Sequence, residues 1–205
     1  EAQSRPLIVA LALLTLLATV WSRPKLRRYL QWTGTEVGNP AHDRFSLTVG
    51  AALASFVLAL PLPILAGLLG WMLQQQGSND RFVWGLSDGL IHAAWISWVI
   101  ESFRRLASRG GVLEAHFRWQ PQTRELLYRN LRWLVILTAL ATVLMRLATA
   151  DPRGLSMPVL GRAVYIVFSV ALVVFIARIF HPARGVLGAW LQSHHEGWAW
   201  RGRNL

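Results

Sequence analysis

Two residues that could do chemistry inside a membrane lie four positions apart in "GLSDGLIHAAW": Asp88 and His92. Residues at this spacing share one face of an α-helix. An ionisable pair within a transmembrane segment is a candidate proton relay or metal site. The simpler alternative is that Asp88 caps the helix near the outer interface, while His92 faces a neighbouring helix one turn deeper. A metal would need further ligands, and no second matching pair occurs.

Two other groups of polar residues are weaker candidates for a reaction centre. "SHHEGW" contains His194, His195 and Glu196, but metal sites favour ligands at i,i+4 or distributed spacing. "GGVLEAHFRW" offers Glu114 and His116 without a nucleophile nearby. The chain has no cysteine and no His-Glu-x-x-His motif. We therefore expect no enzyme, no cofactor and no metal.

Long apolar segments carry these residues. Hydrophobic residues make up 54% of the 205-residue chain and charged residues only 15%, compared with about 25% charged in soluble domains. This composition predicts an all-α integral membrane protein. A net charge of +11 would suggest a nucleic-acid partner in a soluble protein. Here the arginines cluster between apolar blocks, so membrane topology explains them and we expect no nucleic acid.

Five segments are long enough to cross about 30 Å of hydrocarbon, which takes about 20 helical residues. The predicted spans are residues 5–22, 45–73, 83–103, 131–148 and 159–180. The second contains "ALPLPILAGLLG", where Pro61 and Pro63 predict a kink and a candidate hinge. The connecting loops are too short to bury a core of their own, so no soluble domain is expected.

Basic residues alternate between the connections. Residues 23–44, 104–132 and 178–205 hold 5, 7 and 4 of the 21 Lys and Arg residues, whereas 74–82 and 146–162 hold one and three. Cytoplasmic loops carry an excess of Lys and Arg. The alternation therefore predicts an N-terminus outside and a C-terminus inside.

The connection between the third and fourth spans contains "QTRELLYRNLRWL", residues 122–134. Its leucines recur at near-helical spacing and its charges mark the other sides, which predicts an amphipathic helix lying on the inner surface. Pro121 precedes it and favours a helix start there. Arginines near a membrane surface attract anionic lipid headgroups. The arginines expected on this surface are Arg104, Arg105, Arg124, Arg129 and Arg132.

"GVLEAHFRWQPQTRELLYRNLRWL" resembles a segment of the large, multi-helix members of the small-conductance mechanosensitive channel family. In that family a Gly-Leu-x-x-His-Phe segment, often followed by Trp-Pro, precedes a basic stretch and a further helix pair. Here an extra Val112 and Gln120 interrupt the pattern. We expect the matching residues to form a membrane-interface anchor: Gly111, His116, Phe117, Trp119 and Pro121.

The resemblance implies a subunit of a bacterial inner-membrane channel that assembles as a homo-heptamer and opens under bilayer tension to release solutes. The family's pore helix and β-rich domain are not seen in these residues, so the resemblance implies the peripheral, tension-sensing helices. Because the chain begins with Glu1 rather than Met, we expect it to be processed or part of a longer protein. The alternative is a proton-coupled secondary transporter, or a transporter subunit, that uses Asp88 and His92.

Overall fold

Helices make up the secondary structure of the part of the chain that the computed structural model describes, residues 4–36, 45–76, 80–117, 119–150, 157–181 and 185–186. This confirms the predicted all-α class. The helices are α1 (Ser4–Glu36), α2 (Phe45–Ala59), α3 (Pro61–Gln75), α4 (Arg81–Leu106), α5 (Val112–Ala115), α6 (Pro121–Ala150) and α7 (Met157–Ile179).

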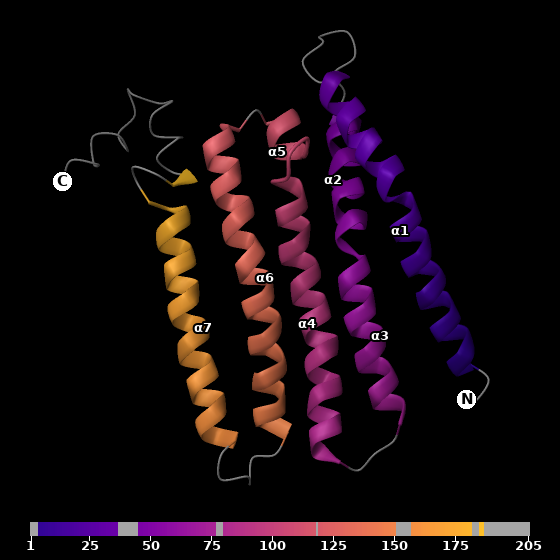
Figure 1. The fold of residues 1–205 in the computed structure, drawn as a ribbon, viewed down its shortest axis with the longest axis vertical. Coiled ribbons are helices and arrows are strands. Elements are labelled where there is room, and N and C mark those ends of the chain that lie inside the picture. Colours follow the sequence, from indigo (N-terminus) through magenta and orange to yellow (C-terminus); the bar gives the residue numbers. More distant parts are fainter. Residues whose placement is uncertain are drawn as a thin grey trace, which may run out of the picture.

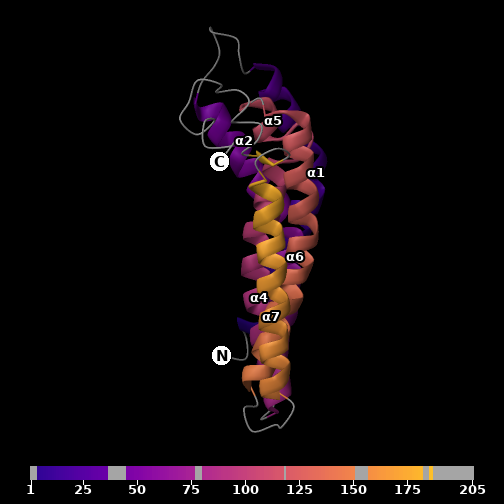
Figure 2. The ribbon, with the colours of Figure 1, turned by 90° about the vertical axis from the view of Figure 1, so that its left-hand side faces the viewer.

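The long helices lie side by side (Figure 1). In that view α4 lies between α3 and α6, and these two interfaces are the most extensive in the bundle. α7 packs on the far side of α6, and α1 packs on α2 and α3. Figure 2 shows that the bundle is narrow at right angles to this view. Such an arrangement leaves much of each outer helix open to lipid.

Small residues allow α4 to approach both neighbours closely. A Cβ atom on Gly89 would lie 2.9 Å from the Cα atom of Val143 in α6. On the other side, a Cβ atom on Gly70 of α3 would lie 2.8 Å from the carbonyl oxygen of Ser87, whose hydroxyl donates to the Gly70 carbonyl at 2.9 Å. Close backbone approach at small residues is the usual way that helices associate in membranes.

A bend of 45° separates α2 from α3, and it lies at the predicted Pro61 and Pro63. Proline has no backbone N–H, so helical hydrogen bonds are lost at these positions. Leu60 N still donates to the Val57 carbonyl at 3.2 Å, and Ile64 N donates to the Leu60 carbonyl at 2.9 Å. Pro61 is the first residue of α3, where a missing donor costs least. The sequence thus places the break between two well-formed helices.

Two helices are longer than the spans predicted from hydropathy. α1 continues through Pro24 to Glu36 and buries Leu30 and Thr33, whereas the predicted span ends at residue 22. A proline removes only one donor, and packing of the following turns compensates for it. The predicted surface helix at 122–134 is corrected as well, because these residues are the first turns of α6. No glycine or proline follows Pro121 before Ala150, so nothing interrupts the helix.

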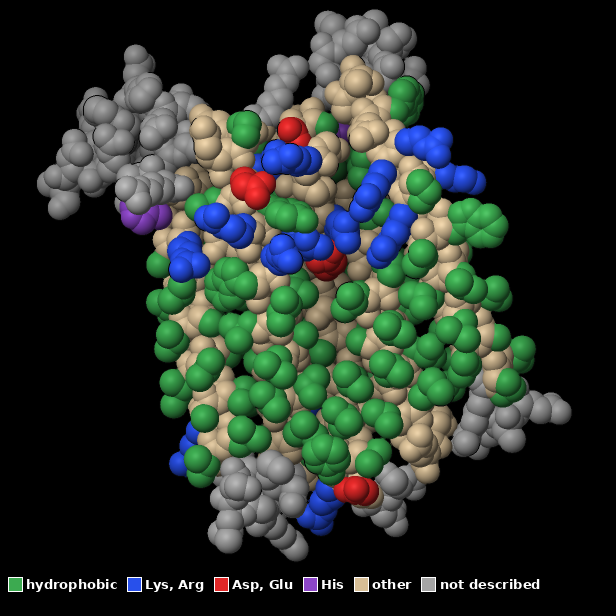
Figure 3. Space-filling model, in the orientation of Figure 1, with side chains coloured by type: hydrophobic (Ala, Val, Ile, Leu, Met, Phe, Trp, Pro, Cys, Tyr) green, Lys and Arg blue, Asp and Glu red, His purple; other side chains and the backbone are tan. Residues whose placement is uncertain are grey.

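Three described helices are long and apolar enough to cross a membrane: α1, α6 and α7. The bent α2–α3 pair counts as a fourth if it forms one span. Hydrophobic side chains cover the middle of the face in Figure 3, and Lys and Arg gather at the end where α5 lies. We call this the basic end. The pattern is that of a multi-pass membrane protein with one strongly charged surface.

Candidate functional site at the basic end of the bundle

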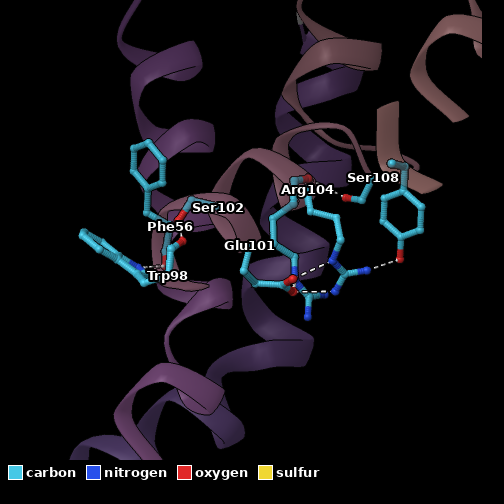
Figure 4. Close-up of polar contacts among 8 residues, drawn as sticks. Phe56, Trp98, Glu101, Ser102, Arg104 and Ser108 are labelled. Atoms are coloured by element: carbon cyan, nitrogen blue, oxygen red, sulfur yellow. Dashed lines mark hydrogen bonds and ion pairs between the residues drawn. The ribbon is translucent and has the colours of Figure 1, made fainter. Parts of the chain in front are cut away.

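Glu101 joins two arginines at the basic end of α4 (Figure 4). Arg104 donates to both of its carboxylate oxygens at 2.5 Å, and Arg105 donates to Oε1 at 2.9 Å. The three side chains are between 13% and 23% exposed. Because these side chains are largely buried, the negative charge of Glu101 offsets the positive charges of the arginines. An unpaired charge taken out of water would be costly.

Tyr128 connects this charge cluster to α6. Its hydroxyl accepts a hydrogen bond from Arg104 at 2.7 Å, and the guanidinium carbon of Arg104 lies 4.9 Å from its ring centroid. A planar guanidinium is suited to both contacts. Trp98, one turn before Glu101, donates from Nε1 to the carbonyl of Phe56 in α2 at 3.2 Å (Figure 4). This end of α4 is therefore held by polar contacts on two sides.

The loop after α4 turns sharply at two glycines. Gly110 has φ = +71°, a conformation that side chains rarely adopt. A Cβ atom on Gly111 would lie 2.6 Å from the carbonyl oxygen of Leu106. Glu114 in α5 accepts hydrogen bonds from Gly110 N and from Arg124 Nη1, each at 2.6 Å. The glycines and the carboxylate together fix how the loop leads into α6.

The motif residues that suggested the family meet at this loop. His116 lies with Nδ1 2.9 Å from the hydroxyl of Thr48, which links the end of α5 to α2. Trp119 N donates to the Leu113 carbonyl at 2.9 Å, and Pro121 starts α6. Phe117 is 59% exposed. The motif therefore builds a joint between helices, and its contact with the membrane interface stays a prediction.

The predicted arginine surface divides into two kinds of position. Arg124 is only 5% exposed and pairs with Glu114, so its side chain faces the protein. Arg104 and Arg105 are partly buried on Glu101. Arg129 and Arg132 are exposed on α6. The sequence did not indicate the pairing with Glu114, because ten residues and a loop separate the partners.

Asp88 joins two helices. His92 Nδ1 lies 3.2 Å from one carboxylate oxygen, and Arg146 Nη1 of α6 lies 3.1 Å from the other. Asp80, rather than Asp88, caps α4, because its side chain accepts from Phe82 N at 2.8 Å. The sequence reasoning missed Arg146 as a partner of Asp88. The sequence did offer one signal for this pair, because Arg146 is a charged residue within an otherwise apolar segment.

No group of three or more potential metal ligands gathers within the described ranges. The residues of the second metal candidate lie outside those ranges: His194, His195 and Glu196. The described site is thus a set of ion pairs and aromatic contacts that joins α4 to its neighbours.

The helical bundle, its basic end and the glycine-rich joint define a multi-helix membrane domain. Residues 6–205 match the family described as mechanosensitive ion channel inner membrane domain 1, and the chain belongs to that family. It is 29% identical over 167 residues to the miniconductance mechanosensitive channel MscM of Escherichia coli (strain K12). That alignment covers 80% of this chain and 15% of MscM. No solved structure matches the chain.

These matches confirm the small-conductance mechanosensitive channel family to which the sequence motif pointed. They also support a multi-pass location in the bacterial inner membrane, in agreement with the apolar helices. The chain spans only a small part of the relative's length.

Proposed function

We propose that this chain is the peripheral, tension-sensing membrane region of a mechanosensitive channel that releases solutes under hypo-osmotic stress. The observation that carries the proposal is the family match over residues 6–205. Similarity to MscM, which is named as a miniconductance mechanosensitive channel, supports it. The proposed subunit assembles as a homo-heptamer within the lipid bilayer, with the pore formed outside these residues.

The bent pair α2–α3 is the proposed moving part. Tension shifts an equilibrium only between states that differ in area or in thickness match with the bilayer. A helix that changes its bend changes both. Leu53 and Leu62, on either side of the break, are 57% and 71% exposed, so lipid can act on both arms. The α3 arm packs on α4, which would transmit the movement to the centre of the bundle.

We also propose that the chain crosses the membrane five times, with α4 as the central span. Under this proposal the basic end lies in the cytoplasm and the N-terminus lies outside. The alternation of basic connections supports it, and so does the gathering of Lys and Arg at one end in Figure 3.

The orientation predicts how introduced cysteines react, since this chain has none of its own. In the full-length protein, with any other cysteines replaced, Gln76→Cys is expected to react with a membrane-impermeant maleimide applied from outside. Arg109→Cys is expected to react only after the inner membrane is opened. Both positions are exposed in the structure. The opposite labelling pattern would show that the orientation is the reverse of the one proposed. Labelling of both cysteines from the same side would show that α4 does not cross the membrane between them.

The function itself is tested with the full-length protein in cells that lack their other mechanosensitive channels. We expect suction on excised patches to evoke currents, and survival of osmotic downshock to rise. Both follow if tension opens a solute-conducting pore. The matched control is the same strain carrying an empty vector. Expression at the membrane without suction-evoked current would contradict the proposal.

The transporter alternative depended on Asp88 and His92 as a proton-coupled site. In the structure Asp88 is also paired with Arg146 of α6, which is the arrangement of an interhelical ion pair. The family match is to channels. We therefore do not propose transport for this chain.

A further inference from the structure

Two neighbouring cavities open at the basic end. The first, of about 480 Å³, lies among α1, α6 and the end of α4, and its lining includes Arg27, Arg105 and Arg109. The second, of about 260 Å³, has an apolar lining that includes Pro61, Pro63 and Ile136, together with further arginines. Leu58 and Arg105 line both cavities. A polar cavity thus adjoins a cavity whose lining is mainly apolar.

The charge of these cavities is not balanced. Six arginines line the two together, against two glutamates. Glu101 is already shared by Arg104 and Arg105, and Glu125 is the other acid. The arginines are Arg23, Arg27, Arg104, Arg105, Arg109 and Arg132.

Several of these arginines lack an acidic partner in the described part of the chain. No carboxylate there lies within ion-pair distance of Arg23, Arg27 or Arg109. Arg23 and Arg104 both repel the positive charge of Arg105. Gathering like charges around partly buried cavities is unfavourable unless an anion joins them. The cavities therefore have the electrostatics of an anion site.

The side chains that line the cavities indicate which class of anion would bind there. Guanidinium groups bind phosphate through paired N–H donors, and the first cavity also presents the side chains of Gln31 and Tyr128. Besides its arginines, the second cavity is lined by leucine, proline, valine and isoleucine side chains. These apolar walls offer no favourable contact to a free anion. An amphiphile with a phosphate head and a hydrocarbon tail complements both.

We propose that the two cavities form one binding site for an anionic phospholipid of the inner leaflet. Its phosphate headgroup lies among Arg27, Arg105 and Arg109, and an acyl chain lies in the second cavity against Pro61 and Pro63. Bound there, the lipid contacts α1, the α2–α3 bend and α6 together. This site shares Arg104, Arg105 and Arg132 with the predicted arginine surface. It differs from that surface because Arg129 lies outside the cavities and Arg124 is paired with Glu114.

Binding is tested on the purified full-length protein in detergent by native mass spectrometry. The probes are dioleoylphosphatidylglycerol, dioleoylphosphatidylcholine and inorganic phosphate. We expect phosphatidylglycerol to be retained most strongly. In Arg27→Gln/Arg109→Gln its affinity should fall about tenfold or more, since each cation near a membrane surface contributes about 1 kcal/mol. Arg129→Gln, which removes an exposed arginine from the same end, should bind as the wild type does.

Three results would overturn the site. They are equal retention of phosphatidylcholine, an equal loss of binding in Arg129→Gln, and competition by inorganic phosphate as strong as that by the lipid. The last would show an anion site without a chain-binding groove. A monodisperse elution profile on size exclusion establishes that each variant is folded. The measurement is made without tension, so its failure leaves the proposed function standing, and absence of tension gating would leave the lipid site standing.

Discussion

Gly89→Ala is expected to lower the thermal unfolding midpoint of the full-length protein in detergent by several degrees. The new methyl group would lie 2.9 Å from the Cα atom and 3.3 Å from the carbonyl oxygen of Val143. Backbone atoms of a neighbouring helix cannot move aside as a flexible side chain can. Overpacking of this kind typically costs about 1–3 kcal/mol. Because α4–α6 is the most extensive interface of the bundle, weaker packing there should destabilise the whole bundle.

The matched control is Gly67→Ala in α3. There the added Cβ would lie 3.6 Å from the Cβ of Ala94, which is ordinary van der Waals contact. Both substitutions replace glycine by alanine, which favours a helix by about 1 kcal/mol in soluble proteins. The difference between their unfolding midpoints therefore reports packing alone. We expect Gly67→Ala to melt at or slightly above the wild-type temperature. Equal midpoints for the two variants would show that α4 and α6 are less closely packed than described.

Hydropathy predicted where the helices lie but less well where they end. The five predicted spans overlap α1, α2–α3, α4, α6 and α7, because apolar runs of that length suit a bilayer core. The continuation of α1 through Pro24 was not predicted, since a proline usually marks a helix boundary. Its polar second half is helical because it packs on α2 and α5. Such tertiary contacts are invisible to a window of residues.

The same limit applies to the candidate site. Pro61 and Pro63 carried a local signal, so the position of the bend followed from the sequence. The ion pair of Glu101 with Arg105 is also local, because the two residues lie four positions apart in α4. Arg124 instead looked like a lipid-facing residue, because a helical wheel shows polar sides without showing what covers them. Its partner Glu114 comes from a different helix, and only the fold brings the two together.

The largest functional effect is expected at the bend itself. Each proline within a helix costs about 3 kcal/mol relative to alanine, so Pro61→Ala/Pro63→Ala should favour a straight α2–α3. A straight, upright helix occupies less area in the membrane plane than a bent one. Tension favours states of larger area, so the variant should resist opening. We therefore expect a higher tension threshold, with an unchanged single-channel conductance because the proposed role is in gating.

If this region senses tension through the bend, patch-clamp recording of the full-length Pro61→Ala/Pro63→Ala protein should show a shift in the opening threshold. The control is Pro6→Ala, in the first turn of α1, where a proline interrupts little. We expect a threshold clearly above that of the wild type for the double variant and a wild-type threshold for the control. A double variant that is folded, inserted and opens at the wild-type tension would show that the α2–α3 bend does not sense tension.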